Sequence, residues 1–189
     1  MGERNKHSPL IKDFSQWMQD HVARKSPLYN NMPPCPFAAR AMARGEVTLS
    51  IIEDLEPIAI IKTYSPQVGM SHIFLWPNFK DMSEDEFDDW LYEQNENNFG
   101  HWVMAFDPRA DREFPVWQAF NQDDYAILLV QSLLEISEAS ANLSNTGYYR
   151  HMPDHILEHI ANREVKAHAW NEIEKRLQSQ GKETCQEER

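Results

Sequence analysis

One cysteine, Cys35, stands directly before Pro36 and a short apolar stretch. Proline is favoured at the first position of a helix, so the sequence predicts a short helix from Pro36 to Gly45 with Cys35 as its N-cap. A thiol at that position meets unpaired backbone N–H groups and the positive end of the helix dipole, which favour the thiolate. Cys35 is therefore a candidate nucleophile, redox group or metal ligand. The alternative is a small apolar side chain beside Phe37 without reactivity.

A charged segment, FDPRADREF, follows the apolar run HWVMAF. Loops beyond the carboxyl ends of strands are favoured places for ligands, and arginines there bind carboxylates or phosphates through paired N–H donors. We expect Asp107 to act as a general base or a metal ligand, and Arg109 and Arg112 to bind an anionic substrate. A surface loop in which arginine pairs with aspartate explains the same residues equally well.

Histidines recur every four residues near the C-terminus, at His151, His155 and His159. On a helix, His155 and His159 share one face, as HxxxH metal ligands do, and Glu158 is a neighbouring carboxylate. This spacing suggests a transition metal, but the sequence does not identify the cofactor. The alternative is a solvated polar face, because the spacing fixes only two ligands.

Two kinds of periodicity describe the elements that must position these residues. Helical spacing or capping signals predict helices over 9–23, 36–45, 83–97, 123–144 and 153–178. Alternation or short apolar runs predict strands over 46–51, 71–76, 101–106 and 116–120. Strands interleaved with helices, followed by two consecutive helices, predict an α+β fold: a small, mainly antiparallel sheet covered by helices, with two long C-terminal helices.

Length and patterning favour a single folding unit. The chain has 189 residues and shows no repeat, low-complexity tract or change of composition that would mark a boundary. At roughly 150 residues per domain, we expect one α+β domain over residues 1–180. The last residues, 181–189, carry no apolar pattern and are predicted to be a disordered tail.

Acidic side chains outnumber basic ones by 30 to 18, which gives a formal net charge of -12. This charge repels phosphate backbones and anionic lipids, so neither nucleic acid nor a membrane is an expected partner. No window approaches the ~18 apolar residues that span a bilayer, and the N-terminus has no apolar signal region. Cys35 and Cys185 are too far apart to suggest a disulfide framework, which predicts a cytoplasmic protein.

The motif Cys35-Pro36-Phe37-Ala38, between an amphipathic helix and a strand, resembles an uncharacterised bacterial family with an N-terminal Cys-Pro-Phe-Ala (CPFA) motif. The resemblance extends through two strands that each end before a proline, and covers most of residues 9–145. Members of the family tend to have His before both prolines, where this chain has Trp76 and Asp107. The resemblance strengthens the prediction that Cys35 is a functional residue, and it implies no particular reaction.

These features predict a soluble enzyme that acts on a small, anionic metabolite through Cys35 and the charged loop. The type of reaction stays open. One alternative is a non-catalytic acidic accessory subunit or adaptor of a larger enzyme, with a protein partner or a homo-oligomer, because the chain lacks a complete catalytic constellation and is strongly charged. A further alternative is a metal oxidoreductase of the non-haem iron type, built on the helical HxxxH pair.

Overall fold

The computed structural model describes residues 8–52, 69–97, 100–109 and 125–187. Its helices are α1 (Ser8–Trp17), the π-helical turn η1 (Met18–Val22), the 3-10 turn η2 (Pro27–Tyr29), α2 (Ala38–Arg44), the 3-10 turn η3 (Pro77–Asp81), α4 (Glu84–Asn97), α6 (Leu133–Ser144) and α7 (Asp154–Glu187). Its strands are β1 (Val47–Ile51), β2 (Ser71–Trp76), β3 (His101–Phe106) and β4 (Ala126–Ser132). The predicted strand over 116–120 lies outside the described residues.

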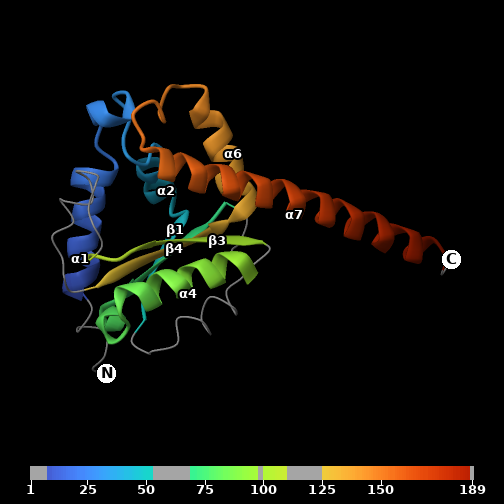
Figure 1. Ribbon diagram of the computed structural model, residues 1–189, viewed down its shortest axis with the longest axis horizontal. Helices are drawn as coiled ribbons and strands as arrows, with labels where there is room; N and C mark the ends of the chain where they lie inside the picture. Colours follow the sequence, from blue (N-terminus) through green and yellow to red (C-terminus); the bar gives the residue numbers. More distant parts are fainter. Residues whose placement is uncertain (1–7, 53–68, 98–99, 110–124, 188–189) are drawn as a thin grey trace.

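The described strands form one sheet in the order β1-β2-β4-β3 (Figure 1). β1 pairs with β2 in parallel, whereas β4 is antiparallel to both of its neighbours, β2 and β3. This mostly antiparallel sheet, with helices packed on it and two consecutive C-terminal helices, confirms the predicted α+β class.

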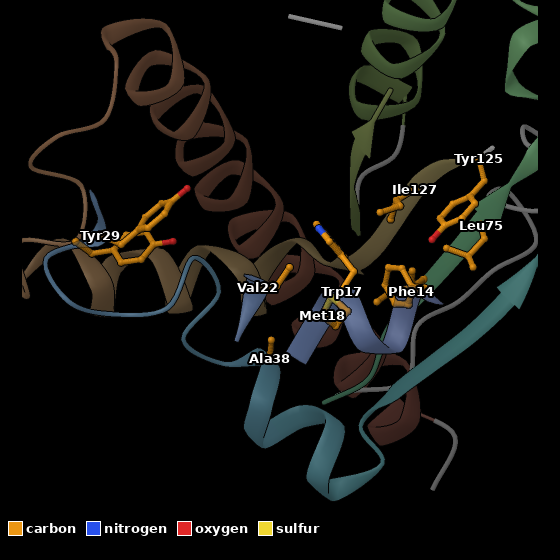
Figure 2. Close-up of a cluster of buried hydrophobic side chains, with 11 residues drawn as sticks. Phe14, Trp17, Met18, Val22, Tyr29, Ala38, Leu75, Tyr125 and Ile127 are labelled. Carbon is orange, nitrogen blue, oxygen red and sulfur yellow. The ribbon is translucent and has the colours of Figure 1, made fainter. Parts of the chain in front are cut away.

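Alternating side chains of the central strands enter separate apolar clusters on the two faces of the sheet. The α1-side cluster contains Ile73, Leu75 and Ile127 together with residues of α1 and η1, several of which Figure 2 shows. The α4-side cluster contains Phe74, Trp76 and Leu128 together with Phe79, Phe87 and Trp90. A third cluster, Trp102, Leu133 and Ala167, lies where β3, α6 and α7 meet.

Local sequence signals end α2 and begin α4 as expected. Gly45 takes a left-handed conformation at φ 68° and ends α2, a geometry that costs glycine little because it has no Cβ. At the start of α4, the amide of Glu86 donates to Ser83 Oγ at 3.3 Å, and the amide of Ser83 donates to Glu86 Oε2 at 2.8 Å. This reciprocal pair is the predicted capping box.

The predicted helix over 123–144 is wrong in its first half. Residues Ala126–Ser132 form β4, the strand between β2 and β3, and the helix α6 begins only at Leu133. A run that is apolar on every residue fits a strand buried on both faces as well as a buried helix. Here Ile127 enters the α1-side cluster and its neighbour Leu128 the α4-side cluster, which is the alternation between opposite faces that a strand produces.

The last helix is longer than its apolar pattern indicates. α7 runs from Asp154 to Glu187, beyond the predicted helix end at residue 178. Lysine, glutamate and glutamine are good helix formers, and extending an existing helix avoids the cost of nucleation. In Figure 1 the C-terminal half of α7 projects well beyond the sheet. No helix among the described residues is long and apolar enough to cross a membrane.

Candidate functional site

Cys35 lies before α2, in the turn that leads into the helix. The N-cap of α2 is Phe37, two residues later than the sequence predicts. Cys35 itself is fixed by two backbone hydrogen bonds: its amide donates to the carbonyl of Val22 at 3.1 Å, and its carbonyl accepts from the amide of Ala38 at 3.2 Å. The chain therefore makes a full turn after Cys35 before regular helical bonding begins.

The thiol of Cys35 packs against the α1-side cluster. Burial raises the pKa of this thiol, and hydrogen bonds from the amides of Phe37 and Ala38 oppose that rise without cancelling it. The amides at the start of the helix thus favour the thiolate as expected, but removal from water has the larger effect. The neutral thiol is the dominant form of Cys35 at neutral pH.

Two tyrosines belong to the same apolar cluster as Cys35. Tyr148 donates its hydroxyl hydrogen to the carbonyl of Pro34, and its ring stacks on Tyr29 with 5.3 Å between ring centroids. Burial raises the pKa of Tyr29 to about 12. The pKa of Tyr148 is raised as well, first by burial and then by Tyr29 and Cys35. Both phenols are therefore neutral, and Cys35 sits in an apolar and phenolic environment.

Asp107 and Arg109 form a closed ion pair after β3. The Arg109 guanidinium donates to both carboxylate oxygens of Asp107, with Nη2 at 2.6 Å from Oδ2, and its backbone amide also donates to Oδ1 at 2.8 Å. Nη1 donates to the carbonyl of Met82 at 2.7 Å, and the guanidinium lies over the ring of Phe79 at 5.0 Å. The N–H donors of Arg109 are thus hydrogen bonded to other groups of the protein. This agrees with the alternative in which the arginine pairs with an aspartate of its own loop.

The structure does not bring Cys35 and the Asp107–Arg109 pair into one site. Cys35 packs with the α1-side cluster, whereas Arg109 contacts Phe79 of the α4-side cluster. Phe106 packs against the α1-side cluster, so alternation along the chain directs Asp107 to the opposite face. The sheet therefore separates the two groups. Arg112, the second predicted substrate-binding residue, lies outside the described residues.

The predicted metal ligands lie on α7. The ring of His159 approaches Trp102 edge-on, with 5.3 Å between centroids, and its pKa is lowered by burial and by the nearby Arg163. Glu158 is exposed, and the side chain of His155 lies outside the described part of the chain. Among the side chains that are described, no three His, Cys, Asp or Glu residues gather where they could hold a metal ion. The metal site stays a prediction.

A histidine between two hydroxyl groups is a feature that the sequence does not reveal. On β1 and β2, His72 Nδ1 lies 2.7 Å from Thr48 Oγ1, and His72 Nε2 lies 3.0 Å from Ser50 Oγ. Thr48 faces His72 directly in the parallel pairing. Burial lowers the pKa of His72, so the ring is neutral and the three side chains tie the edge strand β1 to β2. The contact depends on the register between β1 and β2, which the sequence does not give.

A ridge of exposed apolar residues runs along α7 at a spacing of four. Every member of this outer ridge is exposed to solvent: Leu157, Ala161, Val165, Ala169 and Ile173. Val165 is the most open, at 71% exposed, while Ala167, two residues on, is only 3% exposed. The sequence shows apolar residues along this helix, but their division into a buried face and an outer ridge appears only when Ala167 and Trp170 are seen to pack in the third cluster.

Comparison of the chain with models of protein families, with curated proteins and with solved structures found no match. The resemblance to the CPFA family therefore stays a prediction from the residues of the motif.

Proposed function

We propose that this chain is an acidic accessory protein that acts by docking to another polypeptide through the outer ridge of α7, without a catalytic step of its own. The observation that carries the proposal is the ridge itself. Single exposed apolar side chains are common on protein surfaces and need no explanation. Five that follow one another at a spacing of four along a single helix are what support an interaction surface here, with Val165 as the most open of them.

The position of α7 supports the same function. Most helical stability in proteins comes from packing of an apolar face. α7 satisfies this requirement on its inner side, through Ala167 and Trp170 in the third cluster, and still presents apolar residues outward. Complete burial of one valine side chain contributes about 1.5–3 kcal/mol. A partner on the outer ridge would thus gain from Val165 alone a large part of a weak association free energy.

Site-specific photo-crosslinking tests this function. A photoreactive amino acid replaces Val165 in the full chain, and the matched control carries it at Tyr92 on α4, which is similarly open at 68% exposed. We expect one defined crosslinked product, identified by mass spectrometry, from position 165 and none from position 92. Equal crosslinking at the two positions, or none at 165, would show that the ridge is not a docking surface.

A second candidate function is the enzyme for a small, anionic metabolite, with Cys35 as nucleophile. The observation that favours it is the pair of amides, from Phe37 and Ala38, that hydrogen bond to the thiol and lower its pKa. Burial acts in the opposite direction and has the greater effect on the pKa. An enzyme would therefore need substrate binding to change the surroundings of the thiol.

The rate of alkylation of Cys35 against pH decides this second candidate. A peptide-mapped iodoacetamide reaction on the folded chain reports Cys35 separately from Cys185. Rapid alkylation that levels off below about pH 8 would support an activated thiolate, since an unperturbed thiol has a pKa near 8.5. Alkylation that begins only above pH 9, in parallel with unfolding, would exclude Cys35 as a nucleophile.

A further inference from the structure

One edge of the sheet is formed by β1, whose backbone groups face outward at every second residue. Among the described strands β1 pairs only with β2, in parallel. The amide of Ser71 donates to the carbonyl of Glu46, and the amide of Ile52 donates to the carbonyl of Leu75, each at 2.9 Å. Glu46 and Ile52 therefore point toward β2, and the backbone groups of a strand alternate between its two sides. Three residues, called the outer residues of β1, thus point away from β2: Val47, Leu49 and Ile51.

The two edges of the sheet differ in how their backbone groups are satisfied. On β3, at the opposite edge, the side chain of Asn95 hydrogen bonds to both backbone groups of Val103. In the part of the chain that the structure describes, no side chain or strand takes the corresponding place on β1. An edge with free N–H and C=O groups is a template for a further strand. β1 therefore offers donors and acceptors at the spacing that an added strand requires.

The side chains of β1 determine the pattern of the strand that fits beside it. The outer residues pack against the α1-side cluster and are only partly buried. Thr48 and Ser50 lie on the other face, within hydrogen-bond distance of His72. Neighbouring strands bring residues of one face into contact, so an added strand with apolar residues at alternate positions covers the outer residues further. The residues between them face hydroxyl groups and are expected to be polar.

A basic segment leads into β1, although the whole chain carries a net charge of -12. Residues 21–45 contain no acidic side chain and four exposed cations: Arg24, Lys25, Arg40 and Arg44. α2 contacts both η1 and β1 (Figure 1), and Arg44 Nη1 lies 3.5 Å from Glu46 Oε1, directly before β1. At physiological ionic strength the Debye length is about 8 Å, so distant acidic residues are screened and the local cations dominate. This end of β1 attracts acidic groups.

From these features we infer that β1 binds an extended, acidic segment of a partner protein as an additional strand of the sheet. An antiparallel strand is favoured, because antiparallel pairing is slightly more stable per residue. Its C-terminal flank then lies at the α2 end of β1, where Arg40 and Arg44 attract acidic residues. Glu53 and Asp54 follow β1 in the sequence, so an acidic flank is disfavoured at the other end.

This binding site goes beyond the proposed function and is separate from the outer ridge. β1 and β3 lie at opposite edges of the sheet that the described strands form, and α7 packs where β3 and α6 meet. Peptide binding at β1 therefore does not depend on α7. We expect Val165→Glu to bind the peptides described below with unchanged affinity. A loss of binding in this variant would place the peptide on the outer ridge and overturn the inference.

Fluorescence anisotropy with labelled synthetic peptides tests the inference on the full chain. The probe has the strand Val-Thr-Val-Thr-Val, a glycine and a C-terminal run of aspartates, and the matched control has lysines in place of the aspartates. We expect the aspartate peptide to bind about tenfold more tightly, as a few exposed ion pairs allow, and to weaken as NaCl is added. Tighter binding of the lysine peptide, or no binding of either peptide, would overturn the inference.

Methylation of the peptide amides shows whether the peptide backbone pairs with β1. In the antiparallel arrangement the first, third and fifth residues of the strand exchange hydrogen bonds with the outer residues, while the second and fourth point away. Methyl groups on the amides of the first set are expected to weaken binding at least about tenfold, and methyl groups on the second set less than about threefold. Equal weakening by both sets would show that no strand is added.

A proline in β1 makes the complementary test on the protein. Leu49→Pro removes an outward N–H and keeps the bonds to β2, since proline is tolerated on an edge strand where its nitrogen faces away from the ladder. We expect it to weaken peptide binding at least about tenfold, whereas Leu49→Val, which keeps the amide, leaves binding unchanged. Equal binding by these two variants would overturn the inference.

Charge reversal on α2 keeps the inference testable if circular dichroism shows that Leu49→Pro does not fold. Arg40→Glu combined with Arg44→Glu changes two exposed side chains and leaves the strand intact. This double variant is expected to lose the preference for the aspartate peptide over the lysine peptide. Lys175→Glu, at an exposed position of α7, is the control and should keep the preference. A preference that survives the double variant would overturn the acidic character of the partner segment.

Discussion

The side-chain amide of Asn95 hydrogen bonds to both backbone groups of Val103. Asn95 Nδ2 donates to the carbonyl of Val103, and the amide of Val103 donates to Asn95 Oδ1, each at 2.9 Å. Val103 lies on β3, the strand at one edge of the sheet that the described strands form, and Asn95 lies on α4 and is only 5% exposed. One side chain thus completes the hydrogen bonding of a buried strand edge, in the place where another strand would otherwise pair.

Replacing Asn95 with alanine should therefore cost considerable stability. The change leaves a buried N–H and a buried C=O on Val103 without partners, and each unsatisfied group costs about 1–3 kcal/mol. We expect Asn95→Ala to lower the free energy of unfolding by about 2–4 kcal/mol, measured by urea denaturation. Asn162→Ala, at an exposed position of α7, is the control and should change stability by less than about 0.5 kcal/mol. Equal effects of the two substitutions would contradict the role of Asn95.

The Asp107–Arg109 pair should behave as a structural ion pair. The Asp107 side chain is 5% exposed and accepts from the side chain and the backbone amide of Arg109. Asp107→Ala should lower the free energy of unfolding by about 2 kcal/mol, because it removes the acceptor of a partly buried guanidinium. Asp107→Asn should cost less, since it keeps an oxygen at the position of Oδ1. Urea denaturation of both variants measures these losses. A loss below about 0.5 kcal/mol in Asp107→Ala would show that the ion pair does not stabilise the fold.

Arg163 and Ser140 form a second structural contact, between α7 and α6. Arg163 is 5% exposed and donates from Nη2 to Ser140 Oγ, and burial lowers its pKa while Glu164 and Tyr149 oppose that shift. Ser140→Ala should lower the midpoint of thermal unfolding, since it costs about 1–3 kcal/mol to leave a buried donor unpaired. Ser144→Ala on the exposed side of α6 serves as the control. Identical midpoints for the two variants would show that the contact does not stabilise the fold.

Stability should decrease in mild acid because of three histidines. Burial lowers the pKa of His72 and of His101, and burial together with Arg163 lowers that of His159. Below the unfolded pKa of about 6.5, the unfolded chain binds more protons than the folded chain, so these histidines destabilise the fold as pH falls from 6.5 toward their folded pKa values.

Urea denaturation at pH 7.5, 6.5 and 5.5 measures this effect. We expect a falling midpoint below pH 6.5 and a weaker dependence in His72→Gln, which removes one of the three groups. His151→Gln, at an exposed position, is the control variant. A midpoint that rises between pH 6.5 and 5.5 would contradict the predicted sign.

Local signals in the sequence were sufficient for most element boundaries. Ser83 with Glu86 and the glycine at position 45 act within a few residues of their own backbone, so the capping box and the end of α2 follow from the sequence alone. Cys35 shows the limit of local reasoning. Its amide neighbours were expected from the sequence, but the pKa of the thiol depends on burial against α1, which lies far away along the chain.

The sequence by itself determined the α+β class, the capping box before α4, the glycine that ends α2 and the acidic charge, because these depend on periodicity, short-range hydrogen bonds and composition. Only the tertiary structure decided that residues 126–132 are a central strand, that the sheet separates Cys35 from Arg109, and which apolar side of α7 faces solvent. The physical reason is the same for all three: burial and strand pairing join residues that are distant in the chain, and an apolar run has the same letters whether one face or both are covered.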